Sequence, residues 1–288
     1  MTAPWGGVGI AALLSVLAFG CAPRPSVIHG TSTVRVDPES LRVAALRIPP
    51  APSCQGRGSM RLEIERRRLP ALNLRFGLRD GAALWAILRP GVLAPVLSLW
   101  AGADGWSVRL PRERTALEVD ASDPGGSPLS GPEIARLAHY VLLPQAALGD
   151  LVGLHLLKRG EDWILRGRLS GLPEDLAVLE VWITQTDLAV KRWSLWGRDG
   201  RSLLRVAYDP PRLLTADGGA DQGAIHFVIS SLEAVGTVQV GNLSLEPPAP
   251  FTPPPVPARW DVVSGSRLRR LLDKLQASPE PSEGVLSN

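Results

Sequence analysis

Cysteine is nearly absent from this 288-residue chain, which has two, Cys21 and Cys54. Two cysteines allow at most one disulfide. An excess of charge of one sign is also lacking, because 31 lysines and arginines are balanced by 28 aspartates and glutamates. The positive charges are spread along the chain, so the sequence gives no electrostatic indication of nucleic-acid binding.

Recognisable catalytic and cofactor motifs are lacking as well. The chain contains no G-x-S-x-G, no P-loop and no glycine-rich dinucleotide turn. Its histidines are scattered, and none has metal-ligand spacing to a carboxylate or thiol. They are His29, His139, His155 and His226. We therefore expect a protein that is not an enzyme, with no cofactor and no metal site.

The chain also has no apolar run long enough for a spanning helix, which needs about 20 residues. The run at residues 8–19, VGIAALLSVLAF, has the length of a signal-peptide core and predicts export. It ends in Leu-Ala-Phe-Gly-Cys at residues 17–21, which resembles the lipobox of bacterial lipoproteins. That resemblance implies cleavage before Cys21 and acylation of Cys21 with fatty acyl groups such as palmitate. The alternatives are a plain secretory signal with a chance cysteine, and a Cys21–Cys54 disulfide.

The composition of the rest of the chain favours short β-strands. Apolar residues make up 45% of it, enough for a sizeable core, and 29 glycines with 27 prolines divide it into short elements. Alternating apolar and polar residues predict about ten or eleven antiparallel strands. These are expected at 60–65, 72–78, 82–88, 96–100, 106–110, 163–169, 176–184, 188–196, 203–208, 225–229 and 235–245. Asp80-Gly81 predicts a hairpin, and Gly241-Asn242 predicts a bulge.

Helices are expected in three places, 38–46, 134–143 and 146–154. After a proline-rich segment, residues 266–276 (SRLRRLLDKLQ) form a fourth candidate, with a leucine stripe surrounded by basic residues. Such a helix could lie on an anionic bilayer or in a partner's groove, or pack back on the sheet. Residues 277–288 have the composition of a disordered tail.

Three stretches resemble the bacterial outer-membrane lipoprotein carriers and receptors with the LolA/LolB-like fold. LRPGVLAPVLSLWAGADGWSVRL (88–110) is similar to the receptor's first half, and VLEVWITQTDLAVKRWSLWGRDGRSLLRVAY (178–208) to its second-half hairpins. VGNLSLEPPAPFTPPPVP (240–257) is similar to the closing strand and proline-rich exit of relatives. The resemblance covers about residues 54–257. It implies a strongly curved antiparallel sheet, an incomplete barrel, with a helical lid over an apolar hollow.

The residues themselves also indicate a hollow. Strands 82–88, 96–100 and 176–184 are apolar on both faces, so both faces need cover, while few helices are available to supply it. Nine tryptophans against two tyrosines and four phenylalanines add large apolar surfaces with one polar edge, whether in the core or in a cavity. The candidates to line a ligand cavity are Leu74, Phe76, Trp85, Ile87, Trp100, Trp106, Trp182 and Trp193.

One break between strands is a candidate for contact with a membrane. Residues 90–95, PGVLAP, match the resembled receptor's protruding loop, which helps to deliver its client. Val92 and Leu93 are therefore candidates for membrane delivery. The alternative is that Leu93 begins the next strand.

These observations define four segments and two functions. The segments are a lipoprotein signal peptide (1–20), a tether with a short helix (21–53), the curved-sheet domain (54–257), and an amphipathic helix with a tail (258–288). The first function is a monomer anchored by Cys21 in the outer membrane and facing the periplasm. It would bind acyl chains of a lipid or lipoprotein, received from a periplasmic carrier protein. The second is a structural or interaction lipoprotein of the envelope without a ligand cavity.

Overall fold

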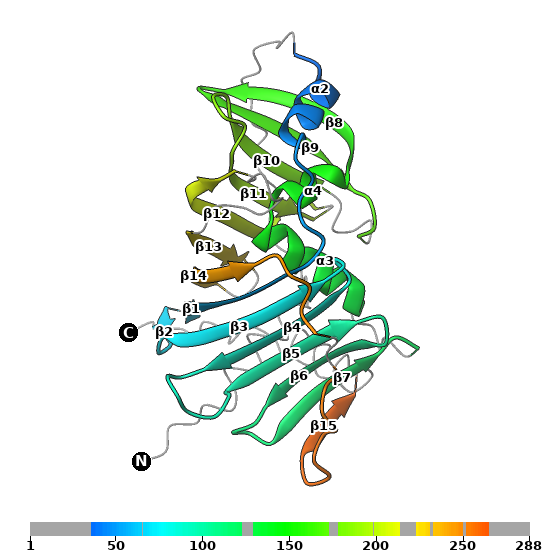
Figure 1. Ribbon diagram of the computed structural model, residues 1–288, viewed down its shortest axis with the longest axis vertical. Helices are drawn as coiled ribbons and strands as arrows, with labels where there is room; N and C mark the ends of the chain where they lie inside the picture. The colour runs from blue at the N-terminus through cyan, green and yellow to red at the C-terminus, as the bar shows by residue number, and fades with distance from the viewer. Residues whose placement is uncertain are drawn as a thin grey trace, which may run out of the picture.

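The computed structural model describes residues 36–64, 66–122, 129–172, 178–197, 199–213, 223–230, 233–249 and 252–264. Within these ranges the protein is mostly β, with fifteen strands and three short helices (Figure 1). The strands are β1 (Cys54–Ile64), β2 (Arg67–Arg68), β3 (Leu72–Arg79), β4 (Ala83–Arg89), β5 (Leu97–Gly102), β6 (Gly105–Leu110), β7 (Thr115–Asp120), β8 (Leu151–Arg159), β9 (Asp162–Leu169), β10 (Val178–Thr184), β11 (Val190–Trp196), β12 (Ser202–Arg212), β13 (Ala224–Ile229), β14 (Ala234–Ser244) and β15 (Asp261–Ser264).

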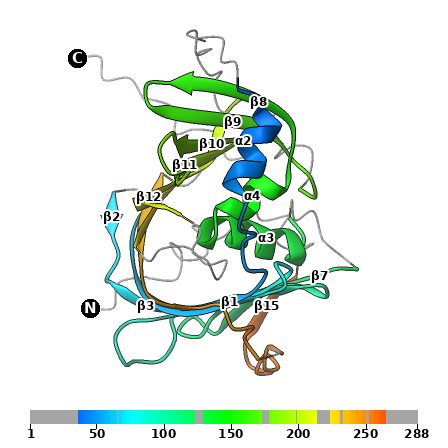
Figure 2. The same ribbon diagram turned by 45° about the horizontal axis from the view of Figure 1, so that its top comes forward.

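All fifteen strands belong to one sheet. Their spatial order is β15-β7-β6-β5-β4-β3-β1-β14-β13-β12-β11-β10-β9-β8, with β2 paired to β1. Neighbours are antiparallel, except that β15 runs parallel to β7. The sheet bends around the helices without closing, since β15 and β8 are its two free ends (Figure 2).

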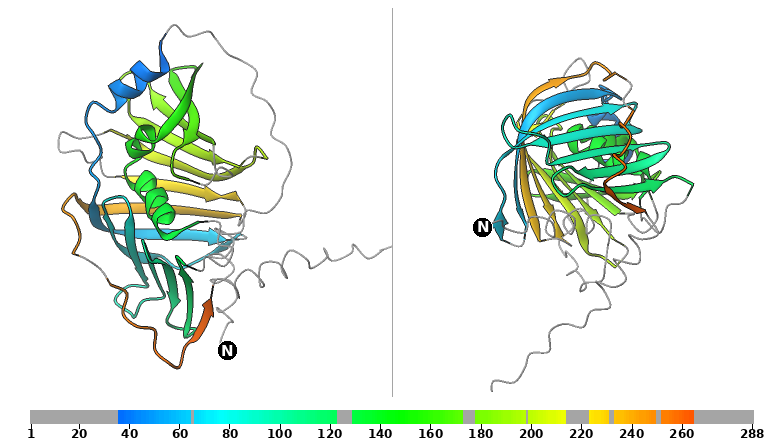
Figure 3. Two further views of the ribbon diagram at one scale, coloured as in Figure 1. Left: turned by 90° about the vertical axis from the view of Figure 1, so that its right-hand side faces the viewer. Right: turned by 90° about the horizontal axis from the view of Figure 1, so that it is seen from below.

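The helices lie across one face of the sheet (Figure 3). They are α2 (Pro38–Ala45), α3 (Gly131–Leu142) and α4 (Gln145–Gly149). The start of α2 is fixed by Asp37, whose carboxylate accepts the Ser40 amide hydrogen at 2.8 Å. The start of α3 is a capping box, in which Ser130 and Glu133 satisfy each other's backbone amides. These caps explain why α2 and α3 begin where they do.

Two apolar cores occupy the helix-bearing face of the sheet. Strands β8–β14 pack with α2 and α4 in the larger core, and strands β3–β7 pack with α3 in the smaller one. In the smaller core, cross-strand register places Leu78, Leu84, Ala101, Trp106 and Val119 in one continuous row. Because side chains alternate along a strand, the residues between these point to the opposite face, here called the outer face.

The expectation of a mostly β protein with a large antiparallel sheet and few short helices is confirmed. Two details are wrong. The sheet has fifteen strands instead of ten or eleven, and it is not curled strongly enough to form an incomplete barrel. The hairpin at Asp80-Gly81 is present, with positive φ at both residues, and β14 is bulged where Arg57 and Gly58 of β1 face Asn242 and Val240.

The prediction of a helix at 146–154 is also wrong for the second half of this range. Helix α4 ends at Gly149, and β8 begins at Leu151. Gly153 has a φ of +65°, and the register shifts between Val152 and His155. The leucines of this stretch therefore belong to a bulged strand and not to a helix. Strands β2, β7 and β15 are also absent from the expected set. In contrast, residues 38–46 and 134–143 coincide closely with α2 and α3.

Several expectations fall outside the described residues. These are the signal peptide, Cys21 and the candidate helix at 266–276, so each stays a prediction. Cys54, by comparison, is a free thiol that is completely buried. No helix among the described residues is both long and apolar enough to span a bilayer.

We expect Gly131→Ala to destabilise the protein, because α3 starts in direct contact with the β5–β6 turn. An added Cβ would lie 2.1 Å from the Gly102 carbonyl oxygen and 2.2 Å from that of Gly105. Overpacking of this kind costs about 1–3 kcal/mol. The matched control is Gly149→Ala, where an added Cβ meets nothing within 4 Å. Urea unfolding followed by circular dichroism measures both variants, and equal stability of the two would contradict this packing.

Candidate functional site

Helix α3 covers part of the sheet and forms one side of the candidate site. Its Ala135 is completely buried, as is Leu143 just after its end, against the core of strands β3–β7. Cys54 is buried in the same core, and this burial raises the pKa of its thiol to about 12. The thiol is therefore a core group and not a nucleophile at neutral pH.

Polar contacts hold α3 in place at several points. Its Tyr140 hydroxyl donates to the Asp150 carboxylate, which follows α4. The Tyr208 hydroxyl of β12 lies 3.2 and 3.1 Å from the carbonyl oxygens of Tyr140 and Val141, at the end of the helix. Tyr208 also accepts a hydrogen bond of 2.8 Å from Trp193 Nε1. Burial raises the pKa of both tyrosines, so each is a neutral hydrogen-bonding group.

Two further side chains of α3 are hydrogen-bonded to loops. Arg136 Nη1 donates to the Gly171 carbonyl oxygen at 3.0 Å. His139 Nε2 lies 2.9 Å from the carbonyl oxygen of Ala51, just before β1. A carbonyl oxygen can only accept, so Nε2 carries the proton. The helix is thus hydrogen-bonded to both halves of the sheet.

Between α3 and the strands, many apolar side chains are only half-buried. They pack against the two cores but leave part of their surface accessible, and none carries a charge. We call this set the apolar face. From α3 it comprises Ile134, Leu137, Ala138, Val141 and Leu142, and from the strands Met60, Leu74, Ala86, Leu97, Leu99, Leu204 and Phe227.

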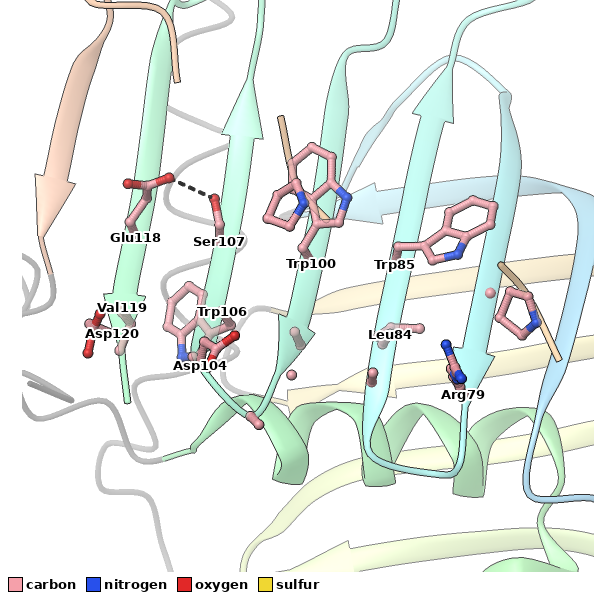
Figure 4. Close-up of a pocket in the computed structure, with 18 of the residues that line it drawn as sticks. Arg79, Leu84, Trp85, Trp100, Asp104, Trp106, Ser107, Glu118, Val119 and Asp120 are labelled. Atoms are coloured by element: carbon pink, nitrogen blue, oxygen red, sulfur yellow. Dashed lines mark hydrogen bonds between the residues drawn. The ribbon is translucent and has the colours of Figure 1, made fainter. Parts of the chain in front are cut away.

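A cavity of about 580 Å³ lies at strands β3–β7, under the C-terminal segment (Figure 4). Trp85 and Trp100 are direct cross-strand neighbours on its outer-face floor, with Ser107 and Glu118 beside them. The Arg109 guanidinium lies 4.7 Å from the centre of the Trp100 ring. The C-terminal segment contributes Pro248, Ala249, Pro253, Val262 and Ser264. Four charged side chains, those of Arg79, Asp104, Glu118 and Asp120, make this cavity far more polar than the apolar face.

The predicted cavity residues are divided between the two faces. Leu74, Phe76, Trp106 and Trp193 lie on the helix-bearing face. Trp85, Ile87, Trp100 and Trp182 lie on the outer face, where the Arg192 guanidinium is 3.7 Å from the Trp182 ring centre. The 580 Å³ cavity brings Trp85, Trp100 and Trp106 together, but the eight residues do not surround one space. Their role as ligand contacts stays a prediction.

Both candidates for membrane delivery lie in the loop between β4 and β5. Val92 is fully exposed and Leu93 is 58% exposed. Strand β5 begins at Leu97, so Leu93 belongs to the loop and does not start the strand. The loop is fastened by Asn73, whose Nδ2 donates to the Gly91 carbonyl oxygen at 3.0 Å. The proposed role of this loop in membrane delivery stays a prediction.

Other features of the site had no clear signal in the sequence. The partners of His139 and Tyr208 are distant along the chain, and the strand β15 that borders the outer cavity is four residues long. Among the described residues, no group of three or more histidines, cysteines, aspartates or glutamates is arranged to hold a metal ion.

No protein-family model and no curated protein matches the sequence. Solved structures that are similar in fold include the following three. A DUF1329 family protein from Desulfovibrio piger is 14% identical, with a TM-score of 0.48, over 72% of this chain and 90% of that one. A putative outer membrane lipoprotein-sorting protein domain from Vibrio parahaemolyticus is 11% identical, with a TM-score of 0.48, over 72% and 93%. A LolA superfamily protein from Nitrosomonas europaea is 14% identical, with a TM-score of 0.47, over 73% and 94%.

The third of these carries the name of the superfamily that stretches of this sequence resemble. At these identities and TM-scores the similarity describes the arrangement of the chain and decides nothing about function. What the site binds has to follow from its own side chains.

We expect the protein to lose stability as the pH falls below the ordinary histidine pKa of 6.5. Burial lowers the pKa of His139, against the opposing effects of its bond to Ala51 and the charge of Asp150. The unfolded chain therefore binds more protons in this range, and the free energy of unfolding falls with falling pH. Chemical unfolding at a series of pH values measures this slope. His139→Gln should reduce it, whereas His155→Gln, at an exposed position, should not. An unchanged slope in His139→Gln would contradict the assignment.

Proposed function

We propose that this protein is a membrane-anchored envelope lipoprotein that binds an acyl chain on its apolar face. The observation that supports this is the set of half-buried, uncharged side chains presented by α3 and the strands opposite. In this proposal, the acylated Cys21 holds the protein on the periplasmic side of the outer membrane. The ligand is a lipid or an acylated protein, received from a periplasmic carrier.

The energetics favour such a surface over the outer cavity. An acyl chain leaving a bilayer loses about 0.8 kcal/mol of burial per methylene, and only a continuous uncharged surface replaces that loss. The outer cavity has a volume typical of small-molecule sites, but its lining includes three carboxylates and a guanidinium. Burial of methylenes there would desolvate charged groups, which is unfavourable.

Helix α3 would have to move to admit a chain of full length. Its N-terminal half packs in the smaller core and its end is hydrogen-bonded to Tyr208, so the opening would have to be a displacement of α3 with its loops, from which the hydrogen bonds of Arg136 and His139 would be released. In the same proposal, the exposed Val92 and Leu93 contact the bilayer during delivery of the ligand.

The proposal predicts that Leu74→Gln weakens acyl-chain binding by about tenfold. Leu74 packs against both cores and is half-buried on the apolar face, and an amide there exposes the chain to an unpaired polar group. The matched control is Ile87→Gln, which is equally half-buried on the neighbouring strand but on the outer face. Titration with the fluorescent fatty acid cis-parinaric acid measures binding in each variant.

A direct measurement accompanies the titration. The protein is purified from the membrane, extracted with organic solvent and examined by mass spectrometry for lipid that is not covalently attached. Co-purifying lipid that is lost in Leu74→Gln and kept in Ile87→Gln supports the proposal. Equal loss in both variants, or no binding by the unmodified protein, would exclude the apolar face as the site.

A second candidate function has an observation of its own. The centre of the larger core is filled by the chain's own side chains, since Trp193 is completely buried and hydrogen-bonded to Tyr208. A protein with a permanently filled interior would be a structural or interaction lipoprotein of the envelope. It would carry no extractable lipid and would not bind the fatty-acid probe.

A further inference from the structure

In the half of the sheet from β1 to β15, three hairpin ends and one further turn emerge at the same edge. Strands β1, β4 and β6 all run towards this edge, and the chain turns there into β3, β5 and β7; β2 marks its position in Figure 1. The C-terminal segment joins them, because the Asp261 amide donates to the Arg114 carbonyl oxygen at 2.9 Å as β15 begins. We call residues 66–68, 90–95, 111–114 and 257–260 together the hairpin edge.

The hairpin edge is rich in exposed arginine. Arg66, Arg67, Arg68, Arg112, Arg114 and Arg259 are all exposed. Among the described residues, Arg68 alone of these six has an ion-pair partner, Glu63 at 3.1 Å. Such solvated guanidinium groups are well suited to phosphate, which they bind with two parallel hydrogen bonds.

Apolar side chains lie between these arginines along the sheet. Val92 and Leu93 protrude from the β4–β5 loop, between the arginines of the β1–β3 and β6–β7 connections. Trp260 is half-buried beside Arg259 at the start of β15. An apolar tip flanked by guanidinium groups and accompanied by tryptophan matches the layered chemistry of a bilayer surface, with phosphates outside and acyl chains beneath.

We infer that the hairpin edge docks on an anionic lipid bilayer, with its arginines on the phosphates and Val92 and Leu93 among the outermost acyl groups. The commitment to a bilayer rests on the charge complementarity and on the apolar tip, which a purely ionic partner would not require. For Val92 and Leu93 the inference rests on the bilayer contact in the proposed function, and it adds the arginines that give the protein a fixed orientation; it does not depend on acyl-chain binding on the apolar face.

The test uses the chain from residue 21 onward with Cys21→Ala, so that no covalent lipid masks the contact. Cosedimentation is measured with vesicles of phosphatidylcholine alone and of phosphatidylcholine mixed with phosphatidylglycerol. We expect binding to the mixed vesicles to be the stronger and to weaken as added salt screens the charges.

The decisive variant is Arg67→Gln with Arg112→Gln and Arg259→Gln. Each basic residue near an anionic surface contributes about fivefold to binding, so the triple variant should bind the mixed vesicles about 100-fold more weakly. The charge-matched control is Arg47→Gln with Arg57→Gln and Arg75→Gln, all exposed. Arg57 lies about 20 Å along β1 from the edge, at the usual rise per residue. The control should lose much less binding.

A second variant tests the apolar tip. Val92→Ser with Leu93→Ser should weaken binding to mixed vesicles and reduce the part that persists in high salt, while Val43→Ser, at an exposed position of α2, should not.

Two results would overturn the inference. Equal loss of binding in the two arginine triple variants would mean that net charge alone causes the effect, and unchanged binding in the hairpin-edge triple would mean that these arginines do not contact the bilayer. Cis-parinaric acid binding should be normal in the hairpin-edge triple, which separates this outcome from failure of the proposed function.

Discussion

The packing of α3 on the sheet is the contact on which the rest of the structure depends. The contact begins at Gly131, whose backbone approaches the backbone of the β5–β6 turn so closely that a larger residue would not fit. From there the helix passes over the smaller core and ends under the Tyr208 hydroxyl, which belongs to the strands of the larger core. One helix therefore connects the two cores of an open sheet that has no closure of its own.

The same contact leaves the apolar face incompletely covered. A helix of twelve residues spans about 18 Å, whereas the fifteen-stranded sheet extends far beyond it. Half-buried leucines on both sides of α3 are the result of this mismatch in size. Sealing them would need a larger helix layer, and the described residues contain three short helices. The accessible apolar surface is thus a consequence of the architecture, and it is this surface that the proposed function uses.

Local patterns allowed much of the sheet to be predicted, but not which face each strand turns to the helices. In residues 82–88, large apolar side chains occupy both alternating sets, so the pattern could not separate Leu84, which faces α3, from Trp85, which faces outward. Trp182 shows the same ambiguity, since it is covered by arginine side chains on the outer face. Strand β15 depends on parallel pairing with β7, about 145 residues earlier, for which four residues carry no local signal.

The apolar face and the hairpin edge are connected through the strands themselves. Leu74 of β3 lies opposite Leu88 of β4, and two residues after Leu88 the chain enters the loop that carries Val92 and Leu93. Apolar surface on the helix-bearing side therefore continues along β4 to the tip of the edge. The outer cavity has no such continuation, because its lining is interrupted by charged side chains. If the edge rests on a bilayer, an acyl chain leaving the apolar face would pass along the leucine side chains of β3 and β4 towards the membrane. Arg89, the last residue of β4, alternates to the outer face, so in the proposal docking and release are parts of one path.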